Sequence, residues 1–264
     1  MRKGIVKTPE EIEALAKGGA LLSRVLGKVA RRVAPGVSTE ALDDLAEKEI
    51  RKAGGRPAFK GYRMPGVKPA YNSTVCTSIN DEVVHGLAHP GRALKEGDVI
   101  KLDIGMQHPA SGGFFTDMAI SVPVGNVSEK ALRLMKITRE CLERAIATVH
   151  AGSRLSDIGR AVQSHAEANG CGVVRDLVGH GVGYDVHEEP RVANYVDATT
   201  QDMVLREGMV IAIEPMINAG TWEVFTADDG WTVKTADGSL SAHFENTIAV
   251  TKDGRRILTP FPEI

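Results

Sequence analysis

The chain is poor in cysteine and aromatic residues, has almost no net charge and contains no long apolar run. Its three cysteines, Cys76, Cys141 and Cys171, are an odd and widely spaced set, which excludes a disulfide framework and a Cys-x-x-Cys zinc pattern. Its 32 basic and 34 acidic residues give a formal charge of −2, which argues against strong electrostatic attraction to nucleic acid. No apolar stretch approaches the length of a membrane span, and no apolar segment of a signal peptide follows the positive N-terminus. These absences predict a cytoplasmic protein with no membrane partner and no specific nucleic-acid partner.

Capping residues and apolar periodicity place helices and strands along the 264 residues. Thr8 and Glu11 form the capping box of a helix start, Ser38 and Ser128 cap two further helices, and Ser156 begins a fourth. Residues 56–74 are rich in glycine and proline and predict a long loop. Apolar runs predict strands over residues 75–79, 83–85, 99–106, 114–122, 210–215, 231–233 and 242–251.

The order of these elements is helices, a hairpin, helices and then hairpin-like strands, which predicts an α+β fold. We expect the helices to cover one face of a curved, largely antiparallel sheet. Helices followed by strands occur twice along the chain, which predicts two related halves with pseudo-twofold symmetry, although the sequence shows no residue-level repeat. No low-complexity linker interrupts the chain, so we expect residues 1–264 to form a single catalytic domain.

Two histidines, His180 and His187, lie in a glycine-rich segment that ends at Pro190. Glycines remove side chains and allow the backbone to approach a ligand closely. Imidazole is both the commonest metal ligand and a common acid–base group. The segment therefore predicts a functional site in which these histidines bind a metal or transfer protons.

Four acidic residues, Asp103, Asp117, Glu214 and Glu245, lie inside predicted strands rather than in turns. One such acid is explained by a solvent-facing strand position, but four of them together with His180 are better explained by a metal centre, since buried carboxylates need compensation. Two divalent cations would balance four carboxylates. Oxygen-rich ligation with one imidazole favours Mn, Co or Fe(II) over a structural zinc. Two cations that share bridging carboxylates, roughly 3.5 Å apart, can hold a hydroxide nucleophile between them.

In this order and context, Asp103, Asp117, His180, Glu214 and Glu245 resemble the metal ligands of the type I methionine aminopeptidases. Further blocks are similar to those of the same family, namely residues 78–86, 179–183, 187–190, 213–216, 230–235 and 241–245. The resemblance implies a pita-bread fold and a metallo-exopeptidase that removes the initiator methionine from nascent proteins by hydrolysis. It also implies two divalent metal ions per chain (Mn, Co or Fe(II)), a bridging water or hydroxide as nucleophile, a monomer and transient contact with the ribosome.

The resemblance also implies individual roles. Asp103 would bind one metal, His180 and Glu214 the other, and Asp117 and Glu245 would bridge the two. His85 and His187 would contact the substrate near the scissile amide, with His187 stabilising the oxyanion. Glu214 would carry a proton from the nucleophile to the leaving amine. The methionine side chain would lie among aromatic, thiol and aliphatic groups that suit a thioether, namely Tyr71, Cys76, Val186 and Trp231.

Several features depart from the family pattern. The turn between Asp103 and Asp117 is longer than usual, the segment 60–70 is expanded, Val186 replaces an aromatic residue, and Asn246 replaces a histidine. Around His85, Val84 replaces a cysteine and Leu87-Ala88 replaces a proline. None of them removes a ligand, so we expect activity.

Two alternatives remain open. A proline-specific aminopeptidase or prolidase of the same fold carries an extra N-terminal domain, for which the segment before the first histidine strand is too short. A non-catalytic ribosome- or RNA-binding protein on this scaffold would be expected to lose ligands, whereas all five are present here.

Overall fold

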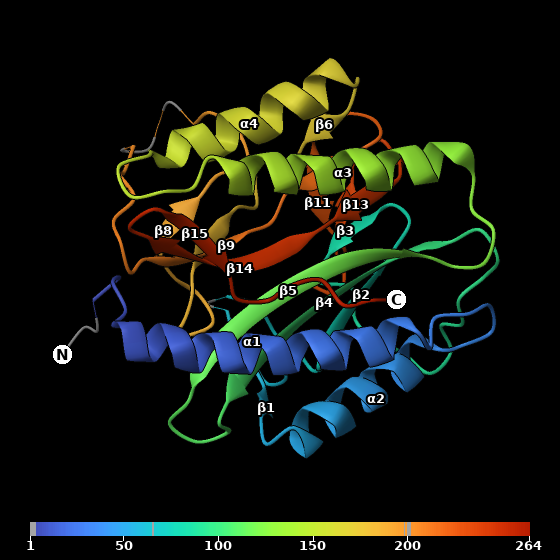
Figure 1. Cartoon of the computed structure of the whole chain (residues 1–264). Coiled ribbons are helices and arrows are strands. Elements are labelled where there is room, and N and C mark those ends of the chain that lie inside the picture. The colour runs from blue at the N-terminus through green and yellow to red at the C-terminus, as the bar shows by residue number, and fades with distance from the viewer. Residues whose placement is uncertain (1–3, 65, 198, 200–201) are drawn as a thin grey trace.

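Four helices flank a large sheet in a computed structural model that describes residues 4–64, 66–197, 199 and 202–264 (Figure 1). The helices are α1 (Pro9–Ala30), α2 (Thr39–Lys52), α3 (Glu129–Ala147) and α4 (Leu155–Ala168). The strands are β1 (Arg56–Pro57), β2 (Val75–Ile79), β3 (Glu82–Val84), β4 (Val99–His108), β5 (Phe114–Pro123), β6 (Gly172–Val173), β7 (Gly179–Gly181), β8 (Glu188–Val192), β9 (Val210–Ile213), β10 (Met216–Asn218), β11 (Val224–Thr226), β12 (Val233–Thr235), β13 (Ser241–His243), β14 (Glu245–Thr251) and β15 (Gly254–Ile257). The predicted α+β class is confirmed. No helix among the described residues is long and apolar enough to cross a membrane.

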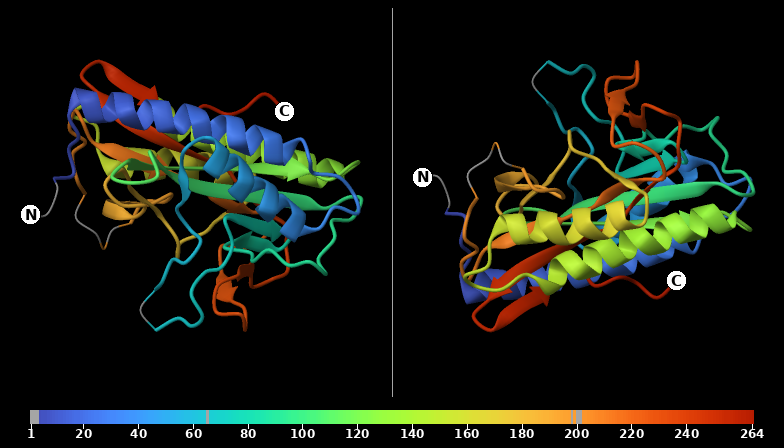
Figure 2. Two further views of the ribbon diagram at one scale, coloured as in Figure 1. Left: turned by 90° about the horizontal axis from the view of Figure 1, so that it is seen from below. Right: turned by 90° about the horizontal axis from the view of Figure 1, so that it is seen from above.

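The main sheet runs in the order β1-β4-β5-β14-β9-β7-β8, with β2 also pairing with β4 and β15 with β14. Every strand pair in the described chain is antiparallel, as predicted. Two small sheets, β13-β10-β6 and β11-β12-β3, complete the fold. Figure 2 shows α1 and α3 on one side of the main sheet, while the loop after β1 and the β11–β12 hairpin project from the other side. The helices thus leave one side of the sheet free to form a site.

The first helix shows how local sequence produces this arrangement. Thr8 and Glu11 form the predicted capping box, in which each side chain accepts a hydrogen bond from the other residue's backbone N–H. The apolar stripe of α1, including Leu22 and Leu26, is fully buried in the core between helices and sheet. Gly19 is required there, since a Cβ would lie 2.1 Å from the carbonyl oxygen of Leu258. The helix can therefore lie directly on the chain that follows β15.

Carboxylates set the starts of two elements that the sequence misplaces. The fourth helix begins one residue before Ser156 because the Asp157 carboxylate accepts a hydrogen bond from the Arg154 backbone N–H at 2.9 Å. The strand predicted over residues 231–233 is β12, which begins only at Val233. The Asp229 carboxylate accepts the backbone N–H groups of both preceding residues, each at 2.8 Å, and holds them in a turn.

One predicted strand is divided in the structure and another ends early, and the two interruptions lie side by side. The predicted strand 242–251 is β13 and β14, separated at Phe244, because β13 pairs with β10 whereas β14 pairs with β5 and β9. The predicted strand 210–215 ends early, and Glu214 and Pro215 separate β9 from β10. At these two interruptions the polypeptide passes between the main sheet, which contains β9 and β14, and the small sheet that contains β10 and β13. Side chains at the breaks are therefore freed from the regular alternation of a strand.

Candidate metal centre and active site

A cavity of about 680 Å³ contains nearly all of the residues that the sequence predicts for the site. Ten of the predicted site residues line it, namely Tyr71, Cys76, His85, Asp103, Asp117, His180, His187, Glu214, Trp231 and Glu245. Val186 does not line the cavity, but it packs in the buried cluster that contains Tyr71, Cys76 and Trp231. Segments far apart in the chain are thus brought together at one place.

The five predicted metal ligands converge because their strands are neighbours. Asp103 is on β4, Asp117 on β5 and Glu245 at the start of β14, where it is paired with Ala119 of β5. Glu214 directly follows β9, and His180 is the central residue of β7. These strands are adjacent in the order β4-β5-β14-β9-β7. Antiparallel neighbours lie about 4.8 Å apart, so their side chains meet within one small volume.

The four carboxyl groups are buried together and destabilise one another's charged forms. Burial raises the pKa of Asp103 to about 7. Burial, followed by repulsion from neighbouring carboxylates, raises the pKa values of Asp117, Glu214 and Glu245 well above their usual range. Within the described residues no lysine or arginine forms an ion pair with any of the four. The site therefore lacks a protein cation that would compensate this charge.

The donor set fits divalent cations. Asp117, His180 and Glu245 each offer a ligand atom, and these atoms lie within 4.8 Å of one another. Asp103 Oδ1 and Glu245 Oε1 are buried and have no hydrogen-bond partner in the part of the chain that the structure covers. A carboxylate oxygen in that state normally coordinates a metal or binds a donor. Four carboxylates and one imidazole form the oxygen-rich set that suits Mn, Co or Fe(II).

His180 is oriented as a metal ligand. Its Nδ1 lies 2.9 Å from the carbonyl oxygen of Gly181, which fixes the proton on that nitrogen and directs the lone pair of Nε2 toward the acids. Nε2 lies 3.5 Å from Glu214 Oε1. Burial lowers the pKa of His180 to about 3, so the ring is neutral and available for coordination. The flanking glycines are required by the neighbouring strands, since a Cβ at Gly179 would lie 2.3 Å from the carbonyl oxygen of Ala212.

His187 lies against His180, with their ring centroids 4.5 Å apart, and both rings line the cavity. Its Nδ1 lies 3.0 Å from the hydroxyl oxygen of Tyr62, which also lines the cavity. Burial lowers the pKa of His187. Sequence reasoning missed Tyr62, although an aromatic residue in a long glycine- and proline-rich loop was a usable signal. The ring of His187 is thus held at the edge of the metal centre with Nε2 free to meet a ligand.

His85 follows β3 rather than ending it, because it has a left-handed backbone with φ of 60°. This conformation is uncommon for a residue with a Cβ and turns the side chain out of the strand's alternation and into the cavity. The next residue, Gly86, lies against β2, where a Cβ would be 2.7 Å from the carbonyl oxygen of Thr77. Burial lowers the pKa of His85 to about 4, so the ring is neutral.

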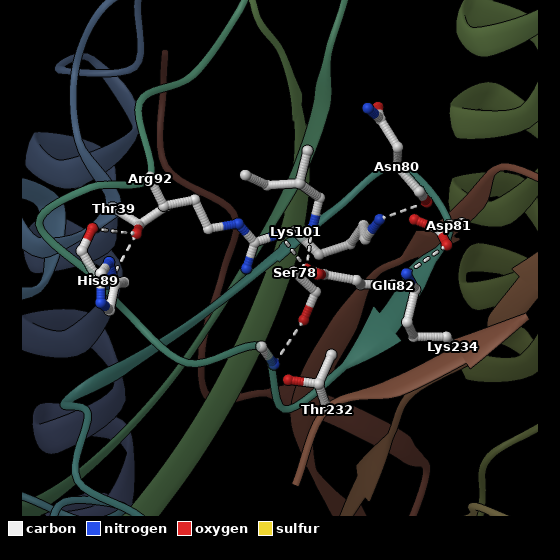
Figure 3. A network of polar contacts seen from close by, with 12 residues as sticks. Thr39, Ser78, Asn80, Asp81, Glu82, His89, Arg92, Lys101, Thr232 and Lys234 are labelled. Atoms are coloured by element: carbon white, nitrogen blue, oxygen red, sulfur yellow. Dashed lines mark hydrogen bonds and ion pairs between the residues drawn. The ribbon is translucent and has the colours of Figure 1, made fainter. Parts of the chain in front are cut away.

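A polar network supports the β2–β3 hairpin that carries His85 (Figure 3). The ammonium group of Lys101, buried on β4, donates to the carbonyl oxygen of Asn80 at 2.9 Å. Lys234 of β12 pairs with Asp81 at 2.8 Å, and the Ser78 hydroxyl accepts the backbone N–H of Gly86 at 2.9 Å. These contacts fix the hairpin from both sides and leave the position of His85 well defined.

The predicted methionine pocket is an aromatic corner. The rings of Tyr71 and Trp231 meet edge to face, with centroids 5.2 Å apart. Tyr71 donates its hydroxyl to the carbonyl oxygen of Gly86 at 3.1 Å, and the Trp231 indole N–H donates to the carbonyl oxygen of Pro69 at 2.9 Å. Their polar ends are therefore satisfied, and their apolar surfaces together with Cys76 are available to an unbranched side chain.

A further histidine near the site, His243, was not singled out from the sequence. It is almost fully buried on β13, and its Nε2 lies 3.7 Å from Glu214 Oε2. His243 lies between Ala242 and Phe244, so the local sequence indicates only an ordinary strand position. Its proximity to Glu214 depends on the pairing of β13 with β10, which local sequence does not reveal.

The chain is similar to known metallopeptidases over nearly its whole length. The profile of metallopeptidase family M24 matches residues 13–252. A methionine aminopeptidase from Clostridium perfringens is 44% identical over 257 residues, which cover 97% of this chain and 98% of that protein. Methionine aminopeptidase 1 from Bacillus subtilis is 42% identical over 256 residues, with the same coverage of both chains.

Solved structures agree with this similarity. The crystal structure of a methionine aminopeptidase from Thermotoga maritima superposes with a TM-score of 0.89 at 41% identity, covering 98% of this chain and 99% of that one. A prolidase from Pyrococcus furiosus superposes with a TM-score of 0.76 at 22% identity, covering 98% of this chain and 66% of that one. The second match shows the fold alone.

Proposed function

The chain belongs to metallopeptidase family M24, and from this premise we propose that it removes the N-terminal methionine of nascent polypeptides by hydrolysis on a dinuclear metal centre. The observation that carries the proposal is the convergence of the five predicted ligand side chains, from four strands and the segment after β9, at the wall of one cavity. The similarity to methionine aminopeptidases at 42–44% identity over almost the full chain supports the choice of substrate. As expected from the sequence, residues 1–264 would act as one catalytic domain.

In this proposal Asp103 would hold one cation, His180 and Glu214 would hold the other, and Asp117 and Glu245 would contribute to both. Support comes from the cluster of Asp117, His180 and Glu245 ligand atoms and from the 3.5 Å approach of His180 to Glu214. When bound, the two divalent cations supply the charge that neutralises the carboxylates, acidifies a water molecule and polarises the scissile carbonyl. Mn, Co and Fe(II) remain the proposed metals because the donor set is rich in oxygen.

The protein's own groups would then position the substrate and move the proton. Glu214 accepts the proton that the attacking water gives up and passes it to the leaving amine. His187, neutral and held by Tyr62, donates a hydrogen bond to the oxyanion that develops on the carbonyl oxygen. His85 hydrogen-bonds the substrate at the scissile nitrogen, since it lines the same cavity.

The methionine side chain is proposed to enter the aromatic corner. Tyr71, Cys76 and Trp231 line the cavity and would contact the thioether, which fits surfaces of this kind. Val186 packs behind this wall, in the same cluster, and would act on the pocket through its neighbours rather than by touching substrate. We further propose a monomer that works in the cytoplasm in transient contact with the ribosome.

A peptidase assay on the purified protein tests the proposal. Peptides that start with Met-Ala, Met-Leu and Xaa-Pro are offered to the protein before chelation, after chelation, and after addition of Mn, Co or Fe(II). We expect release of methionine from Met-Ala peptides, loss of activity on chelation and recovery with the metal. Cleavage confined to Xaa-Pro peptides would favour a proline-specific enzyme. Absence of cleavage under all metal conditions would favour a binding protein on the same scaffold.

A further inference from the structure

His243 is held firmly by its backbone on the buried side of the metal centre. The Ser121 hydroxyl of β5 accepts the His243 N–H and donates to the His243 carbonyl oxygen, each at 2.9 Å. On the other side of the strand, His243 is paired with Met216 of β10. The imidazole is 1% exposed. The position of the ring is therefore set by two strands, and it does not depend on solvent or on a mobile loop.

Neither ring nitrogen of His243 has a hydrogen-bond partner within the described chain. Buried polar side chains are hydrogen-bonded in the large majority of cases, because an unmade bond costs about 1–3 kcal/mol. An ionisable neighbour on this side is Glu214, whose Oε2 lies 3.7 Å from Nε2. That separation is longer than a hydrogen bond, which requires about 3.2 Å or less. The His243 ring thus lies near the Glu214 carboxylate without forming a hydrogen bond to it.

The Glu214 carboxylate in turn lacks a hydrogen-bond donor within the described chain. Its backbone is fixed, because Asn194 donates to its carbonyl oxygen at 3.0 Å. No donor in the described chain hydrogen-bonds its carboxylate, which lies between two imidazoles, with His180 3.5 Å from Oε1 and His243 3.7 Å from Oε2. Of these two rings only His180 lines the cavity. The carboxylate therefore has one oxygen on the side of the metal site and one on the side of His243.

Taking Glu214 as the ligand and proton carrier of the proposed function, we infer that His243 is a positioning residue for it. The Nε2–H of His243 donates to Glu214 Oε2, which leaves Oε1 to the cation shared with His180. A neutral imidazole supplies one donor, and one donor is what the carboxylate lacks. A movement of less than about 1 Å makes the bond, and bonds of this kind commonly tighten when a site is loaded. Such outer partners of metal ligands are worth about 10–100-fold in metal affinity or activity.

Three substitutions separate this role from a structural one. His243→Gln keeps a donor near the position of Nε2, His243→Asn keeps an amide with a donor only near Nδ1, and His243→Leu removes all donors. Thr138→Val is the matched control, since Thr138 is equally buried on α3 and its hydroxyl bonds only to Leu134 in the same helix. Metal binding is measured by calorimetric titration of the metal-free proteins with Mn, and kcat and KM are measured on a Met-Ala peptide.

We expect the Asn and Leu variants to bind one of two Mn ions about 10–100-fold more weakly and to lose kcat by a similar factor. The Gln variant should remain within about threefold of the parent, and KM should change little because the aromatic corner is untouched. Without metal, the melting temperature of the Leu variant should not fall, since the ring makes no hydrogen bond there. The control should match the parent in metal affinity and in kcat.

Two results would overturn the inference while leaving the proposed function intact. One is parental Mn affinity and kcat in the Asn and Leu variants. The other is equal loss in the Gln, Asn and Leu variants, which would indicate that shape rather than the donor matters. Should the Leu variant fail to fold, the Gln and Asn pair decides, because both carry an amide at residue 243 but only Gln keeps a donor near the position of Nε2. Failure of the unsubstituted protein to bind two metal ions or to release methionine would instead contradict the proposed function.

Discussion

The ammonium group of Lys7 lies 2.6 Å from Glu188 Oε2, and the Lys7 side chain is completely buried. The other carboxylate oxygen of Glu188 accepts the backbone N–H groups of Tyr184 and Asp185, the latter at 2.7 Å. The loop that leads into His187 is therefore folded around one carboxylate. That carboxylate is neutralised by a lysine just before α1, which connects the segment before α1 to the loop beside His187.

Replacing Lys7 with Met keeps the apolar stem and removes the charge, which leaves Glu188 without its cation. We expect a loss of about 3–5 kcal/mol in the free energy of unfolding and a fall of about tenfold in kcat, because the loop that leads into His187 loosens. Lys28→Met is the control, since Lys28 pairs with Glu49 at the surface with its side chain 48% exposed, and such pairs are worth up to about 1 kcal/mol. Urea unfolding measures the change in stability and peptide assays measure the change in kcat. Equal effects in the Lys7 and Lys28 variants would contradict a link between Lys7 and the His187 loop.

Asp117 and Glu245 are proposed to lie between the two cations. Asp117→Ala or Glu245→Ala should therefore abolish the binding of both ions, whereas Asp44→Ala, at an exposed carboxylate of α2, should have no effect. Calorimetric titration with Mn gives the stoichiometry directly. Two ions bound with parental affinity in either variant of the pair would show that the bridging assignment is wrong.

His187→Ala should separate transition-state stabilisation from metal binding. Loss of a donor to the oxyanion typically costs 10²–10³-fold in kcat, and we expect a decrease of about that size. Metal stoichiometry should stay at the parental value, and His150→Ala, at an exposed histidine, should leave both quantities unchanged. A calorimetric titration in which the His187 variant loses one ion would make this residue a ligand.

The hydroxyl of Tyr62 is expected to orient His187. Tyr62→Phe keeps the aromatic wall but removes the group that lies 3.0 Å from His187 Nδ1. We expect kcat to fall by about three- to tenfold with little change in KM, because one neutral hydrogen bond is worth about 1 kcal/mol. Steady-state kinetics on a Met-Ala peptide are sufficient, and a rise in KM alone would assign Tyr62 to substrate binding instead.

The buried carboxyl cluster predicts an unusual pH dependence for the metal-free protein. Burial raises the pKa of Asp103 to about 7 in the folded chain, against roughly 3.9 in an unfolded one. The stability that this group contributes is therefore fully present below about pH 4 and is lost as the pH rises to 7. Relative to Asp103→Asn, which does not titrate, the parent should lose more than about 1 kcal/mol across this range. Urea unfolding with chelator present tests this, and a difference that is independent of pH would contradict it.

The candidate metal ligands could be singled out from the sequence because the energetic cost of their acidic members is local. An acid such as Asp103, between Leu102 and Ile104, is costly in any buried strand and points to a cation without knowledge of the fold. His243 was not predictable in this way, and Tyr62 offered only the weaker signal of an aromatic residue in a loop. Each acquires its proposed role through a contact with a residue far along the chain.

Some predicted strand boundaries were wrong for the same reason, because they depend on contacts with residues far along the chain. The break at Phe244 exists because β13 and β14 pair with different partners, and the late start of β12 depends on the carboxylate of Asp229. Hydrophobic periodicity records which residues are buried, but it does not record which sheet a strand joins. The overall class and the order of elements were therefore accessible from the sequence, whereas the exchange between sheets beside Glu214 was not.

The position of β14 has a consequence for the order in which the protein matures. This strand is synthesised after all the others on the path of the main sheet, yet it is inserted between β5 and β9. Until it arrives, β5 and β9 have no common neighbour, and the two halves of the cavity wall are not joined. A chain whose β14 has not yet emerged from the ribosome therefore cannot assemble the complete site, so peptidase activity should appear only once β14 has been released to fold.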